Sequence, residues 1–205
     1  MIKRVIGLLA ALCLLGGCAP TEFDASRYVQ GILDSTYLER YDDYIELTGV
    51  TAEQAKDEFL QGLDAEADVF LQYYGIESVS QPVRDELISM YREIYQKSKY
   101  TVGEAQKTGE GYRVEVTISP IDIFSISGSA VDAKINELAA QSGGPEQNDD
   151  LANGIIGAVR AYIPQIGYTE ERTVSVLVYR DEEGLYGLGE DDFYSLDQWI
   201  IDYSL

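Results

Sequence analysis

The side chains that could carry out chemistry in this sequence are mainly carboxylates and phenols. The 205 residues include 36 aspartates and glutamates and 16 tyrosines but no histidine, and both cysteines, Cys13 and Cys18, lie near the N-terminus. Without histidine, the Ser-His-Asp and Cys-His arrangements of nucleophilic catalysis are excluded, and the commonest transition-metal ligand is missing. Paired carboxylates can still hydrolyse glycosidic bonds. Because so many acids make any pair easy to find, we name no catalytic residue.

Five tyrosines are candidates for a ligand-binding groove. Helical spacing places Tyr37, Tyr41 and Tyr44 on one face, and Tyr73 and Tyr74 end a later helical stretch. Their rings are suited to a groove for sugars, peptides or amines. The alternative is a core boundary, in which the rings pack inward and the hydroxyls reach water.

Two acidic segments, residues 181–183 and 190–192, supply oxygen ligands of the kind that calcium prefers. Their spacing does not fit an EF-hand loop. The first is also typical of a hairpin turn, and the second of a helix N-terminus, where acids are stabilised by the helix dipole. The sequence has no P-loop and no dinucleotide-binding fingerprint. We therefore expect no metal site and no cofactor.

The N-terminus has the order of a secretory signal. Lys3 and Arg4 precede an apolar run over residues 5–15, which is too short to cross a bilayer. Small residues follow, and Leu15-Gly16-Gly17-Cys18 resembles the lipobox of bacterial lipoproteins. The resemblance implies cleavage between Gly17 and Cys18 and a diacylglyceryl group on the Cys18 thiol. The alternative is an ordinary signal peptide with a chance cysteine.

This interpretation divides the chain into a signal peptide (residues 1–17), a lipidated tether (18–23) and one globular domain (24–205). We expect the domain to lie outside the cytoplasm, held to the cell membrane by the lipid on Cys18. The mature chain would keep 13 basic and 36 acidic residues, a net charge of −23. That charge excludes nucleic acid as a partner and disfavours anionic lipid surfaces. It either serves solubility alone or attracts cationic ligands, cationic peptides or divalent ions.

The periodicity of the remaining chain predicts two rounds of helices followed by a hairpin. Residues 23–47 form one or two helices, Thr51 and Gln54 open a helix over 51–74 with a capping box, and another helix starts near residue 81. Alternation predicts strands over 100–102, 112–118, 173–179 and 185–188. Helices are predicted over 130–141, from Asp149 or Asp150 onward, and over 193–203. The fold class is thus α+β, with helices packed on one antiparallel sheet of about four strands in the order ααββ-ααββ-α.

The domain also resembles small extracytoplasmic lipoproteins of Gram-positive bacteria. The residues that carry this likeness are the 51–74 helix, the 112–124 segment with Ser119-Pro120-Ile121-Asp122, and Leu196-Asp197. Some such families have cystatin-like or NTF2-like folds, and the resemblance implies no known activity.

Three functions remain open. The first is a non-enzymatic module that binds a small ligand, a peptide or an envelope protein, which the aromatic content and the lack of catalytic residues favour. The second is a carbohydrate-active hydrolase that uses paired acids. The third is a structural envelope protein without a ligand, which predicts a filled core and no concave aromatic pocket.

Overall fold

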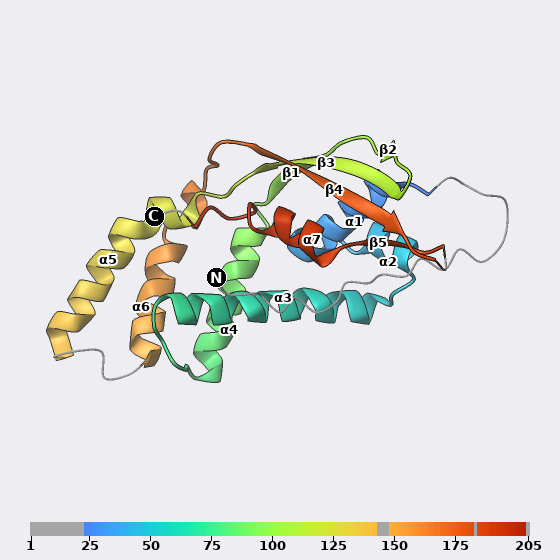
Figure 1. Cartoon of the computed structure of the whole chain (residues 1–205). Helices are drawn as coiled ribbons and strands as arrows, with labels where there is room; N and C mark the ends of the chain where they lie inside the picture. Colours follow the sequence, from blue (N-terminus) through green and yellow to red (C-terminus); the bar gives the residue numbers. More distant parts are fainter. Residues whose placement is uncertain (1–22, 143–147, 183, 204–205) are drawn as a thin grey trace.

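The computed structural model describes residues 23–142, 148–182 and 184–203, and the side chains of all of these except 141 and 142. The helices and strands form an elongated molecule in which a sheet lies across several helices (Figure 1). The helices are α1 (Ala25–Leu38), α2 (Asp42–Thr48), α3 (Ala52–Tyr73), α4 (Gln81–Tyr95), α5 (Ile123–Ser142), α6 (Asn148–Arg160) and α7 (Glu190–Asp197), with a short 3₁₀ helix, η1 (Ile163–Gln165). The strands are β1 (Lys99–Val102), β2 (Gln106–Lys107), β3 (Gly111–Ser119), β4 (Arg172–Arg180) and β5 (Tyr186–Leu188).

The five strands form one antiparallel sheet in the order β1-β3-β4-β5, and the short β2 also pairs with β3. The β3–β4 pairing joins the two predicted hairpins, with Val114 opposite Val176 and Val116 opposite Val174. Val114, Val116 and Ile118 point into the core, and the alternating Arg113 and Glu115 are exposed. The α+β prediction, with helices on one antiparallel sheet, is therefore confirmed.

Helix α3 begins as its sequence predicts. The Gln54 backbone nitrogen donates to Thr51 Oγ1 at 3.1 Å, and the Thr51 backbone nitrogen donates to Gln54 Oε1 at 2.8 Å, which completes the capping box. These two bonds satisfy backbone donors that the first turn of a helix leaves unpaired. The apolar stripe that follows includes Leu63 and Ala67, both fully buried.

Three other elements differ from their predicted bounds. Helix α5 starts at Ile123 instead of residue 130, and inside it the Ser127 hydroxyl donates to the Ile123 carbonyl at 2.7 Å. Helix α6 starts at Asn148, and Asp149 accepts a hydrogen bond from the Ser80 backbone nitrogen at 2.8 Å instead of capping α6. Helix α7 ends at Asp197, so the segment after it is not helical.

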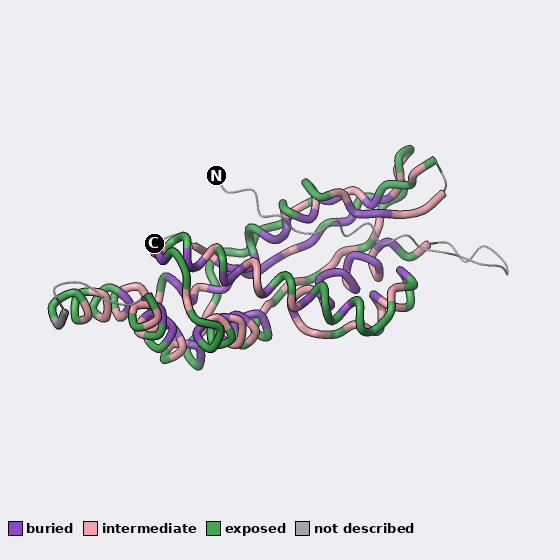
Figure 2. The backbone as a smooth tube through the Cα atoms, turned by 90° about the horizontal axis from the view of Figure 1, so that it is seen from below, coloured by how far each residue is buried: buried purple, intermediate pink, exposed green. Residues whose placement is uncertain are grey.

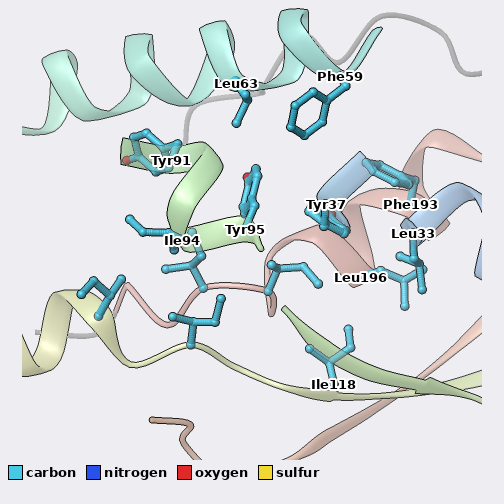
Figure 3. Close-up of a cluster of buried hydrophobic side chains, with 14 of the residues drawn as sticks. Leu33, Tyr37, Phe59, Leu63, Tyr91, Ile94, Tyr95, Ile118, Phe193 and Leu196 are labelled. Carbon is cyan, nitrogen blue, oxygen red and sulfur yellow. The ribbon is translucent and has the colours of Figure 1, made fainter. Parts of the chain in front are cut away.

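The core lies between the sheet and the helices beneath it (Figure 3). Leu63 from α3, Tyr91 and Ile94 from α4, Leu196 from α7 and Ile118 from β3 converge there. In Figure 2 the buried stretches of the chain lie along the strands and the central helices, whereas the far end of α5 is largely exposed. The α5–α6 pair therefore projects from one end of the molecule (Figure 1).

The start of the described chain packs against β5, and β5 lies toward the opposite end of the molecule from α5 and α6 (Figure 1). The Phe23 ring stacks on Tyr186 of β5, with centroids 4.0 Å apart and planes 6° apart. Its ring also contacts Tyr28 at 5.5 Å and Tyr112 at 6.0 Å. Aromatic packing thus holds the chain onto the sheet from residue 23 onward.

Candidate functional site

The five candidate tyrosines do not form one groove. Tyr37 is 0% exposed and Tyr44 is 2% exposed, so neither ring can line a surface open to solvent. Tyr41 is half-buried, and only Tyr73 and Tyr74 lie together. The predicted shared helical face is lost because the chain breaks between α1 and α2, at the left-handed residue Glu39 (φ 56°).

The hydroxyls of both buried tyrosines donate to carboxylates, that of Tyr37 in the interior and that of Tyr44 at the exposed residue Glu58. Tyr37 donates to Asp197 Oδ1 and Tyr44 donates to Glu58 Oε2, each at 2.8 Å. The expected inward packing of the rings is therefore observed, but carboxylates accept the hydrogen bonds that water was expected to accept. Buried phenols need such partners, so these two residues stabilise the fold.

Tyr73 and Tyr74 belong to a pocket that we call the aromatic pocket. Its lining residues come from the end of α3, from α4, from the first turn of α5 and from the segment after α7: Val69, Phe70, Tyr73, Tyr74, Tyr91, Phe124 and Tyr203. The cavity volume is about 40 Å³, and the lining is almost entirely apolar. Tyr73 is 59% exposed and therefore forms the outer rim.

The six rings form a continuous series of contacts. Tyr73 meets Tyr74 edge-on at 4.9 Å, and Tyr74 meets Phe70 at 4.8 Å. The ring centroids of Phe70 and Phe124 each lie 6.4 Å from the ring centroid of Tyr91. Phe124 in turn stacks on Tyr203, with centroids 5.0 Å apart and planes 22° apart. This arrangement gives the pocket stiff walls, because each ring limits the rotation of the next.

The sequence predicts the α3 contribution but not the rest of the pocket. Residues 69, 70, 73 and 74 share one side of a helix, which their spacing indicates. Tyr91, Phe124 and Tyr203 are added by tertiary packing across more than a hundred residues, and no local pattern shows that they meet. The only signal in the sequence is the high tyrosine content.

A buried carboxylate lies directly behind the pocket. Glu66 is 5% exposed and accepts hydrogen bonds from the hydroxyls of Tyr95 and Tyr203, each at 2.9 Å. Burial, together with the Glu66 and Asp197 carboxylates, raises the pKa of Tyr95 well above its ordinary value. Tyr203 thus presents its ring to the pocket and its hydroxyl to Glu66.

These buried carboxylates are poorly placed for hydrolysis. Glu66 and Asp197 are both buried among tyrosines, whereas glycoside hydrolysis needs two carboxyl groups that flank a sugar bond in an open cleft. Of the acidic segments considered for calcium, Asp181 accepts from the Leu185 backbone nitrogen at 2.8 Å within a turn, and residues 190–192 open α7. The described residues contain no group of three or more potential metal ligands.

The predicted lipidation and cleavage residues, Gly17 and Cys18, lie outside the described residues. Among the described helices, none is both long enough and apolar enough to span a membrane.

No protein-family model matches the chain, and neither does any curated protein. Among solved structures, the chain is similar to ycdA of Bacillus subtilis, which is described as a putative lipoprotein. The TM-score is 0.67 at 14% sequence identity, and the match covers 87% of this chain. The chain spans 56% of the length of that structure. The cystatin-like or NTF2-like expectation stays a prediction. The α+β domain therefore shares its fold with part of a protein described as a lipoprotein.

Proposed function

We propose that this chain is an extracytoplasmic lipoprotein, anchored to the cell membrane through Cys18, whose folded domain is a non-enzymatic binding module with the aromatic pocket as its ligand site. The single observation that carries the binding role is the apolar pocket, walled by six aromatic rings and opening beside the exposed Tyr73.

The anchoring part of the proposal rests on the N-terminal sequence and is supported by the structural likeness. Leu15-Gly16-Gly17-Cys18 follows a charged and apolar leader, and the ycdA structure with the same fold is described as a putative lipoprotein. Two acyl chains on one cysteine would hold the protein firmly, whereas a single chain binds a membrane only marginally.

The binding part of the proposal rests on physical cost. Water at apolar ring surfaces is unfavourable, so a concave aromatic site open to solvent loses stability compared with a filled one. Ligand sites are typically such concave, largely apolar pockets. A purely structural envelope protein predicts the opposite, a filled core without a concave aromatic site, and the buried positions of Glu66 and Asp197 give the hydrolase alternative no support.

The lipid anchor is tested by mass spectrometry and membrane fractionation of the full chain expressed in a bacterial host. The Cys18→Ala variant should lose the diacylglyceryl mass and the membrane fraction. The matched control is Cys13→Ala, which removes the other cysteine within the predicted signal peptide and should leave both unchanged. Membrane retention of the Cys18→Ala protein with its diacyl mass would contradict the anchor.

The binding role is tested by thermal unfolding of the chain from residue 19 onward with a panel of amines, peptides and sugars. A compound that binds the pocket should raise the melting temperature of the wild type by mass action. The rise should disappear in Tyr73→Ala and persist in Tyr194→Ala, a control tyrosine on α7 that is 47% exposed. The binding role is wrong if no compound raises the melting temperature, or if the rise is equal in both variants.

A further inference from the structure

The segments that form the aromatic pocket carry acidic residues and almost no basic ones. Residues 66–74, 123–133 and 198–203 contain no lysine or arginine, but they contain Glu66, Asp68, Asp132 and Asp202. These segments are therefore acidic, although Arg84 of α4 pairs with Asp68 at 2.8 Å, and they belong to a chain whose net charge is −21.

Two of these acids act on the pocket tyrosines. Glu66 accepts the Tyr203 hydroxyl at 2.9 Å behind the pocket. Near the rim, Asp132 lies close enough to affect Tyr74, whose pKa is raised to about 12 by burial first and then by the charges of Tyr73 and Asp132. Negative charge at both the back and the rim lowers the energy of a cation in the pocket.

Arg92, the basic residue next to the lining residue Tyr91, is engaged elsewhere. Its guanidinium lies over the Phe59 ring at 5.6 Å and its Nε lies 3.3 Å from Glu39 Oε1. The Arg92 guanidinium therefore does not occupy the pocket, and the cationic group of a ligand can occupy it instead.

The aromatic lining of the pocket determines which kind of ligand group it can bind. The almost entirely apolar lining offers little to the hydroxyls of a sugar or the oxygens of an anion. Aromatic ring faces attract cations, and Tyr and Phe attract them within about 6 Å of the ring centroid. A suitable ligand group combines a positive charge with a carbon-covered surface, which is the chemistry of a methylated ammonium.

The volume of the pocket also limits the size of the ligand group that can enter it. A cavity of about 40 Å³ admits only a small part of a ligand. That space suits a compact branched head group and is small for a sugar ring or an indole. The rest of a longer ligand would extend past Tyr73 into solvent.

We infer that the aromatic pocket binds the methylated ammonium group of an organic cation. This inference deepens the proposed binding function and rests on it. The ring faces hold the methyl groups, and the carboxylates behind and beside the rings stabilise the charge. A trimethylammonium group can belong to a free solute or to a lipid headgroup, and both present the same chemistry to the pocket.

The test compares choline with its neutral carbon isostere, in which a tert-butyl group replaces trimethylammonium. Isothermal titration calorimetry on the chain from residue 19 onward measures both, with sodium chloride as the ionic control. Choline should bind at least about fivefold more tightly than the isostere, which is the order of one cation–π contact. Equal or tighter binding of the isostere overturns the inference but leaves the pocket as a binding site for apolar groups.

Variants distinguish the contribution of the Tyr73 ring to choline binding from that of the Asp132 charge. Tyr73→Ala should weaken choline binding by about fivefold or more, whereas the control Tyr194→Ala should not change it. Asp132→Asn should weaken choline and leave the isostere unchanged, and the matched control Asp191→Asn on α7 should change neither. If choline does not bind while another panel compound binds through Tyr73, the inference is wrong and the proposed function stands. If nothing binds, both are wrong.

A vesicle experiment identifies the source of the ammonium group. Vesicles of phosphatidylcholine are sedimented with the same unlipidated chain, with and without free choline. Co-sedimentation that choline abolishes assigns the site to a lipid headgroup. Choline binding without co-sedimentation assigns it to a free solute. Co-sedimentation that choline does not affect argues for a different surface and counts against the inference.

Discussion

Alkaline pH should unfold this domain because several buried phenols resist ionisation. Burial raises the pKa of Tyr44, Tyr95 and Tyr100 above the ordinary value, and the carboxylates beside them, Glu58, Glu66 and Asp34 in turn, raise it further. A tyrosine in the unfolded chain ionises near pH 10. A raised folded pKa means that the stabilisation is complete below about pH 10 and is lost as the pH rises through the folded pKa.

The expected slope follows from proton linkage. Each tyrosine that is protonated in the folded state and ionised in the unfolded chain lowers the free energy of unfolding by about 1.4 kcal/mol per pH unit. Three such groups give about 4 kcal/mol per pH unit well above pH 10. Since small domains are stable by about 5–15 kcal/mol, unfolding should follow within roughly one to four pH units above 10.

The assay is an alkaline titration that follows tyrosinate absorbance and far-ultraviolet circular dichroism together. The buried tyrosines should ionise in one cooperative step with the loss of helix. Tyr44→Phe should reduce the slope by about 1.4 kcal/mol per pH unit, whereas Tyr194→Phe on the surface should not change it. A gradual ionisation of all 16 tyrosines near pH 10 with full helix content would refute the assignment of buried phenol–carboxylate pairs.

Three further changes test separate parts of the structure. Tyr203→Phe removes the hydroxyl that donates to Glu66 at 2.9 Å and should lower the free energy of unfolding in urea by about 1–3 kcal/mol. Arg84→Ala removes the guanidinium that donates to Asp64 at 2.6 Å and holds the pKa of that carboxyl below its usual value. Because the pair is partly exposed, we expect a loss of at most about 1 kcal/mol at pH 7, which should vanish as acid protonates Asp64. Gly31→Ala would place a Cβ 3.0 Å from a backbone nitrogen of α2 and should destabilise by about 1–3 kcal/mol.

Matched controls keep these three tests specific. Tyr194→Phe changes an exposed hydroxyl and should leave the urea midpoint in place. Gly62 lies in α3 with nothing within 4 Å of an added Cβ, so Gly62→Ala should stabilise the protein by about 0.5–1 kcal/mol. An Arg84→Ala deficit that persists at low pH would show that the lost packing, and not the charge on Asp64, is responsible.

The sequence predicted what depends on short-range patterns. The capping box at Thr51 and Gln54 and the alternation at Val114, Val116 and Ile118 both lie within a few residues, and both are confirmed. The early start of α5 was missed because three serines and a glycine over residues 125–129 have low intrinsic helix preference.

The candidate site was harder to predict because it depends on a break between two helices and on contacts between residues far apart in the sequence. A non-glycine residue in the left-handed conformation, Glu39, ends α1 and redirects the chain into α2, so Tyr37 and Tyr44 lie on different helices, and both rings are buried. The pocket needs Tyr203 to reach Phe124. Such a contact is set by tertiary packing, which periodicity does not encode.

The stacked Phe23 limits how the domain can stand on a bilayer. Four residues separate a lipidated Cys18 from Phe23, whose ring stacks on Tyr186, and the five steps between them span at most roughly 18 Å when fully extended. With so short a tether, an acylated protein would keep the β5 end of its long axis against the headgroups. The opposite end, where α5 and the C-terminal segment meet (Figure 1), would then point outward, so that the aromatic pocket would meet solutes arriving from outside the cell.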